Sequence, residues 1–178
     1  MLAHLAALML ASAAADTSAV QCGIHNLDAC QNTNQLVWDD NFDDALRKFV
    51  GNQSANWLYE DGTEIGQVID VLGGPPDDKV ELPSGLLRFS ACRPHSCDEK
   101  GAVFLTPDGT IEVIAILHFN CGNGCSDAYT LTILVHKEDE HFVKHAETWA
   151  ADVLNEHDRE FPRYPLPRWD KVEVLMRP

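Results

Sequence analysis

The fold of this chain is decided by residues 86–119, which read LLRFSACRPHSCDEKGAVFLTPDGTIEVIAILHF. Runs of apolar and β-branched residues at 86–92, 102–105 and 110–119 predict three strands. Pro107, Asp108 and Gly109 form a turn between the second and third strands, since Pro and Gly supply the backbone angles that a tight turn needs. Strands joined by such short connections pair antiparallel, so this stretch predicts a meander.

The elements outside this stretch extend the same design. Residues 129–135 predict a further strand, and residues 172–175 predict an edge strand. Residues 66–72 predict a weak strand, since they contain Val68, Ile69 and Val71. Apolar residues at i, i+3, i+4, i+7 and i+8 predict a helix over 42–50, and a similar stripe predicts another over 138–155. We therefore expect an α+β domain with a single antiparallel sheet of about five strands packed by helices.

Length and composition limit the possible functions. The chain has 178 residues, of which 45% are hydrophobic, which is enough for one domain with a proper core. Its 13 basic and 28 acidic residues give a formal net charge of −15. Such a chain repels the phosphates of nucleic acid and of anionic lipid, and it attracts basic proteins. No apolar run reaches the roughly 20 residues that a membrane-spanning helix needs, so we expect neither nucleic acid nor membrane as a partner.

The first fifteen residues resemble a signal peptide. Residues 2–10 are almost wholly apolar and are followed by small residues, with Ala13-Ala14-Ala15 before Asp16 as the cleavage site. The segment lacks the Lys or Arg that usually precedes the apolar region, and a buried N-terminal helix is the alternative interpretation. We expect 1–15 to be removed on export and 16–178 to form a single domain.

Six cysteines follow the predicted cleavage site. An even number in an exported chain of this size indicates disulfides, and pairing of sequence neighbours gives Cys22–Cys30, Cys92–Cys97 and Cys121–Cys125. Six cysteines allow 15 pairings, so the connectivity stays open. Zinc is the alternative, with His25, His95 and His118 near the cysteines, but no pair has the C-x-x-C spacing of structural zinc sites.

The loop between Cys92 and Cys97 contains four residues, Arg93, Pro94, His95 and Ser96. Pro94 restricts φ, and a disulfide would hold both ends of the loop at the tip of a hairpin. A rigid protruding loop loses little conformational entropy when it binds, so it suits insertion into a cleft. The alternative is an ordinary disulfide-closed turn with His95 in solvent.

The segment Ser90-Ala91-Cys92-Arg93-Pro94-His95-Ser96-Cys97 resembles the hallmark loop of the Ivy family, the periplasmic inhibitors of vertebrate, c-type lysozyme. The likeness covers roughly 42–119 and depends mainly on the hexapeptide, which in the family has the form Cys-Lys-Pro-His-Asp-Cys. Arg93 replaces the family's Lys, Ser96 replaces its Asp, and the other two cysteine pairs are additions to the family pattern.

The resemblance implies a periplasmic inhibitor and not an enzyme. Lysozyme holds a carboxylic acid and a carboxylate on either side of the glycosidic bond, and in this family the loop His inserts between them. His95 would take that role, while Arg93 and Ser96 would contact the wall of the cleft. The net charge of −15 would steer a cationic lysozyme toward the loop.

Other candidate sites are weaker, and no catalytic constellation or cofactor motif is present. His141 and His145 lie at i and i+4 on the second predicted helix, a spacing that zinc sites use, but no third ligand is evident, so we expect no metal. The alternative function is an envelope binding module that docks on another partner, such as a lytic transglycosylase. The sequence leaves homodimerisation open.

Overall fold

The computed structural model describes residues 21–137 and 139–177, and the predicted signal peptide at 1–15 lies outside them. The elements in chain order are η1 (Leu27–Ala29), α1 (Thr33–Val37), α2 (Asp40–Val50), β1 (Ser54–Ala55), β2 (Gly62–Thr63), α3 (Glu64–Leu72), β3 (Val80–Glu81), β4 (Leu87–Arg93), β5 (Ser96–Leu105), β6 (Ile111–His118), β7 (Cys121–Gly122), β8 (Gly124–Cys125), β9 (Tyr129–Val135), α4 (Glu140–Glu160) and β10 (Trp169–Met176). They form an α+β fold, as predicted.

The main sheet has six strands in the order β10-β9-β6-β5-β4-β3. The predicted meander is present, since β4, β5, β6 and β9 pair antiparallel in succession. The expectation of a wholly antiparallel sheet was wrong, because β10 runs parallel to β9. The 21 residues of α4 carry the chain back along the sheet before β10 begins, and a crossover of this kind produces a parallel neighbour.

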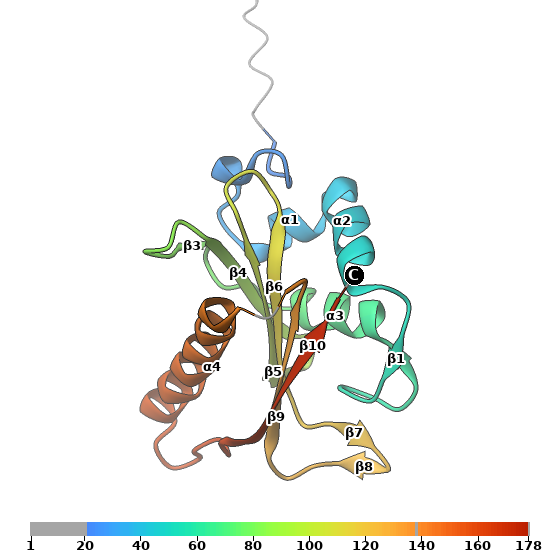
Figure 1. Cartoon of the computed structure of the whole chain (residues 1–178). Coiled ribbons are helices and arrows are strands. Elements are labelled where there is room, and N and C mark those ends of the chain that lie inside the picture. The colour runs from blue at the N-terminus through green and yellow to red at the C-terminus, as the bar shows by residue number, and fades with distance from the viewer. Residues whose placement is uncertain (1–20, 138, 178) are drawn as a thin grey trace, which may run out of the picture.

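The sheet lies between two helical layers, with α4 on one face and α1, α2 and α3 on the other (Figure 1). Alternate residues of one strand enter different cores: Val103 and Leu105 pack toward α2 and α3, whereas Ala102 and Phe104 pack toward α4. Both faces of β6, β9 and residues 101–105 of β5 are buried, which explains why these segments are mainly apolar in the sequence.

The predicted weak strand at 66–72 was wrong, because these residues belong to helix α3. The Thr63 side chain caps the helix by accepting a hydrogen bond from the backbone N–H of Gly66 at 3.2 Å. Ile65, Val68 and Leu72 follow a helical spacing and are buried against the sheet. The β-branched residues had suggested a strand, but this buried face outweighs their weak preference for extended backbone.

Both predicted helices are present. Helix α2 begins after Asp39, whose carboxylate accepts from the N–H of Asn41, and ends before Gly51. Helix α4 is capped by Asp139 and is longer than predicted, since it continues to Glu160. Among the described residues, no helix is long and apolar enough to cross a membrane.

The meander gives the sheet two ends of different character. The β4–β5 turn and the β6–β9 connection, which contains β7 and β8, lie at one end. The β5–β6 turn lies at the other, where Gly109 approaches the backbone of Ile24 so closely that a side chain at Gly109 would overlap it. Residues 22–30 are therefore at the opposite end from β7 and β8 (Figure 1).

Candidate functional site

The β4–β5 hairpin ends in a two-residue turn made of Pro94 and His95. Cys92 and Cys97 form the predicted disulfide across its base, with 4.7 Å between their Cα atoms. Both turn residues are exposed, and His95 has a φ of 65°. Pro followed by a residue of positive φ is the pattern of a type II turn. Asn, Asp and His are the side chains most often found at such positive φ, so His95 suits this position, and its side chain is exposed.

The base of this loop is supported from the edge of the sheet by residues 74–76. The backbone N–H of Cys92 donates to the carbonyl oxygen of Pro75 at 3.1 Å, and Pro76 forms a bridge to Ala91. Gly74 lies so close to the hairpin that a Cβ atom there would overlap the carbonyl oxygen of Cys92 and lie 2.8 Å from the nitrogen of Pro94. The loop is therefore held by a second segment as well as by its disulfide.

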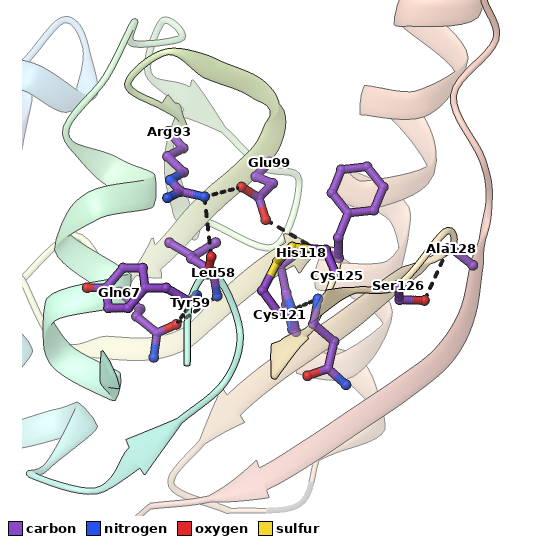
Figure 2. The surroundings of a disulfide bond; sticks show 12 residues. Leu58, Tyr59, Gln67, Arg93, Glu99, His118, Cys121, Cys125, Ser126 and Ala128 are labelled. Carbon is purple, nitrogen blue, oxygen red and sulfur yellow. Dashed lines mark hydrogen bonds and ion pairs between the residues drawn. A yellow bond between two sulfur atoms is a disulfide. The ribbon is translucent and has the colours of Figure 1, made fainter. Parts of the chain in front are cut away.

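Arg93 does not project with His95 toward solvent. Its Nη1 donates to Oε2 of Glu99 at 2.6 Å and to the carbonyl oxygen of Leu58 at 3.5 Å (Figure 2). The Glu99 side chain is only 3% exposed and that of Arg93 is 29% exposed, so the pair closes the inner side of the loop. In this structure Arg93 orients the loop from inside and is only partly available to contact a partner. Ser96, the remaining loop residue, is half-buried.

Sequence reasoning missed Glu99. A register shift between Cys92 and Arg93 leaves 97–99 without partners on β4, because Cys92 pairs with Lys100 and Arg93 with Ser96. This bulge turns the Glu99 side chain under the loop. No local pattern in the sequence marks the bulge. A glutamate next to Lys100 looks the same in the sequence whether its carboxylate is buried or solvated.

A second disulfide-closed hairpin lies beside the first. Strands β7 and β8 are joined by the predicted Cys121–Cys125 disulfide. The N–H of Cys121 donates to the carbonyl oxygen of Trp57 at 3.1 Å, and Oε1 of Glu99 accepts from the N–H of Phe119 at 3.5 Å. Glu99 thus contacts the first hairpin through Arg93 (Figure 2) and the segment that leads into the second hairpin through Phe119.

The turn after Trp57 fills the space between the two hairpins. Tyr59 is 37% exposed, and its hydroxyl donates to Oδ2 of Asp70 on α3 at 3.1 Å. Partial burial, together with the Asp70 carboxylate, raises the pKa of Tyr59. Tyr59 therefore remains a neutral hydrogen-bonding group at neutral pH.

His118 lies behind this end of the sheet and is 1% exposed. Its Nδ1 accepts from the N–H of Asn120 at 3.0 Å, and its Nε2 is 2.8 Å from Oγ1 of Thr132. Burial lowers the pKa of His118 to about 4, because the surroundings solvate an imidazolium poorly. The ring is therefore neutral at physiological pH and serves the packing of this end.

The residues of the zinc alternative do not meet. Every cysteine is in a disulfide, the third being the predicted Cys22–Cys30. His118 is buried, His95 is at the loop tip, and His25 is at the opposite end of the sheet. On α4, Nε2 of His141 and Nε2 of His145 are 3.1 Å apart. Within 21–137 and 139–177, no group of three or more His, Cys, Asp or Glu side chains is arranged to hold a metal ion.

The arrangement is a rigid, protruding hairpin tip that bears an exposed imidazole. No protein-family model matches this chain, and no curated protein and no solved structure is significantly similar to it.

Proposed function

We propose that this protein is a periplasmic inhibitor of c-type lysozyme, which blocks the active-site cleft with the Cys92–Cys97 loop and acts by binding and not by catalysis. The observation that carries the proposal is the exposed His95 on a two-residue turn whose base is closed by a disulfide. A tip of this shape enters a cleft with little loss of conformational entropy.

The chemistry of the imidazole fits the target. The two carboxyl groups of a retaining glycosidase lie about 5–5.5 Å apart on either side of the scissile bond. An imidazole has two ring nitrogens on different edges, so one ring between the carboxyl groups faces both of them. His95 would fill the place of the substrate, while the net charge of −15 attracts a cationic enzyme.

The test is inhibition of c-type lysozyme in a turbidity assay of bacterial cell-wall lysis, with wild type, His95→Ala and His95→Gly. Glycine tolerates the positive φ at this position, so His95→Gly removes the imidazole and keeps the turn. We expect both variants to lose about 30- to 1,000-fold in affinity, as typical for a buried central anchor. Circular dichroism should show an unchanged fold.

Two results would overturn the proposal. Inhibition by either variant within about threefold of wild type would mean that His95 is not the anchor. Absence of inhibition by wild type, together with capture of a lytic transglycosylase on the immobilised protein, would favour the alternative of an envelope binding module.

A further inference from the structure

We propose that the Cys121–Cys125 hairpin, together with the exposed Asp127 that follows it, is a second contact element of the same binding surface, and that Asp127 meets a cationic group at the rim of the cleft that the His95 loop enters. The inference deepens the proposed function and rests on it. It goes beyond the loop because it assigns a role to a disulfide that is separate from the hexapeptide.

The first argument is the size of a specific interface. Such an interface buries about 800 Å² on each partner and involves about 20–30 residues of each. The Cys92–Cys97 loop has six residues, of which Pro94, His95 and Cys97 are exposed while Arg93 is engaged with Glu99. The loop alone is too small, so a tight complex needs surface beside it.

The second argument is position. The β4–β5 turn and the β6–β9 connection emerge at the same end of the sheet, because β4, β5, β6 and β9 pair antiparallel in succession. Glu99 is bonded to both elements, through Arg93 on one side and Phe119 on the other (Figure 2). Glu99 therefore links the two connections, and a partner that receives one hairpin is brought next to the other.

The third argument is how the intervening turn contacts the two hairpins. The carbonyl oxygens of Trp57 and Leu58 accept from Cys121 and from Arg93, respectively. On the β7 side, a Cβ atom at Gly122 would lie 3.4 Å from the side-chain nitrogen of Asn56. Residues 56–58 thus contact both disulfide hairpins.

The fourth argument is charge. Exposed carboxylates are present on all three segments, namely Glu60, Asp61, Asp98 and Asp127. Asp98 follows the first disulfide, and its carbonyl oxygen accepts from the hydroxyl of Tyr129, which places it near the base of the second hairpin. A surface of this sign is complementary to a basic protein and repels an acidic one. The partner it fits is a cationic protein with a cleft.

The experiment compares two single charge reversals that change the net charge equally, from −15 to −13. Asp127→Lys lies beside the second hairpin, and Asp28→Lys lies at the opposite end of the sheet, in the Cys22–Cys30 segment; both side chains are exposed. Affinity for c-type lysozyme is measured for both, for wild type and for His95→Ala. We expect Asp127→Lys to weaken binding about tenfold and Asp28→Lys less than about twofold.

A second pair of variants tests the geometry of the hairpin. Cys121→Ser/Cys125→Ser removes the disulfide of the second hairpin, and Cys22→Ser/Cys30→Ser removes the one at the far end as a matched control. We expect the first pair to weaken binding about tenfold and the control less than about twofold. Circular dichroism checks that each variant folds.

The outcomes separate the two proposals. If wild type does not bind lysozyme, the proposed function fails, and this inference fails with it. If wild type binds and His95→Ala does not, the proposed function stands. In that case, equal effects of Asp127→Lys and Asp28→Lys would overturn the inference alone, because charge would then act over the whole molecule and not through a contact at the second hairpin.

Discussion

The guanidinium of Arg93 donates from Nη1 to Oε2 of Glu99 at 2.6 Å, beneath the loop that carries His95. The two residues are six positions apart in the chain and are brought together by the bulge after Cys92. The carboxylate is almost fully buried, so it depends on this one cation for compensation of its charge. Arg93 is thereby a positioning residue for the loop.

Removal of either partner should therefore destabilise the domain. We expect Arg93→Ala and Glu99→Gln each to lower the free energy of unfolding by about 1–3 kcal/mol. The first leaves the buried Glu99 carboxylate without its cation, and the second removes the charge that strengthens the bond from Arg93. Urea unfolding of both single variants and the double variant measures the coupling between them. A coupling energy below about 0.5 kcal/mol would show that the interaction between Arg93 and Glu99 does not stabilise the domain.

The matched control for this pair is Arg93→Lys, which keeps the charge. Arg93 makes its bonds to Glu99 and to the carbonyl of Leu58 from the same atom, Nη1. A lysine ammonium also carries N–H donors on one charged atom, but it lacks the planar, delocalised shape of the guanidinium. We expect a smaller loss of stability than for Arg93→Ala. Equal losses would mean that charge plays no part in the contact.

Loss of the Cys92–Cys97 disulfide should reduce the affinity for lysozyme more than it reduces the free energy of unfolding. A loop this short restricts the unfolded chain by only roughly 2 kcal/mol, whereas the disulfide closes the base of the exposed turn. We expect Cys92→Ser/Cys97→Ser to remain folded by circular dichroism and to inhibit lysozyme at least about tenfold less well. Full inhibition by a variant without the disulfide would contradict this role.

Salt should slow association more than it speeds dissociation. At about 0.05 M salt the Debye length exceeds 10 Å, and at about 0.5 M it falls to roughly 4 Å, so the attraction between an acidic inhibitor and a cationic enzyme is screened. We expect the association rate constant in stopped-flow experiments to fall at least about tenfold across this range. An association rate constant that is independent of salt would restrict the role of the acidity to solubility.

His118 predicts how stability depends on pH. Its pKa is about 4 in the folded protein and about 6.5 when unfolded, so between these values the unfolded chain binds a proton that the folded protein does not. The free energy of unfolding should therefore fall as the pH is lowered from about 6.5 to about 4, by on the order of 2–3 kcal/mol from this group.

Urea unfolding of wild type and His118→Gln between pH 4 and 7.5 measures this effect. Glutamine offers a donor and an acceptor of similar reach but does not titrate, so the variant should show a weaker loss of stability on acidification. Parallel pH profiles for the two proteins would assign the acid sensitivity to other groups.

Much of the fold could be predicted from local pattern. The apolar runs and short turns of 86–119 predict a meander, and the spacing of apolar residues over 42–50 predicts an amphipathic helix; both are present. The segment 66–72 was misread because β-branched residues mask a helical stripe in a window of only seven residues. The direction of β10 depends on the length of α4 and on which edge of the sheet is free, and neither is a local property.

In the candidate site, too, some features follow from neighbouring residues and others depend on segments that are distant in the chain. The hexapeptide loop and the exposure of His95 follow from neighbouring residues, namely two cysteines separated by four residues, one of which is a proline. The partners that hold this loop come from elsewhere in the chain, namely Glu99 across a bulge, Pro75 from the edge of the sheet and Leu58 from the turn before α3.

The sequence by itself therefore determined the strands of the meander, the two predicted helices and the loop that carries His95, since each depends on residues close together in the chain. It favoured the pairing of cysteine neighbours but left the connectivity open. Only the tertiary structure decided that Arg93 turns inward and that the Cys92–Cys97 and Cys121–Cys125 hairpins share one end of the sheet. Those relationships depend on strand register and on the burial of a carboxylate, and both arise only when segments distant in the chain pack together.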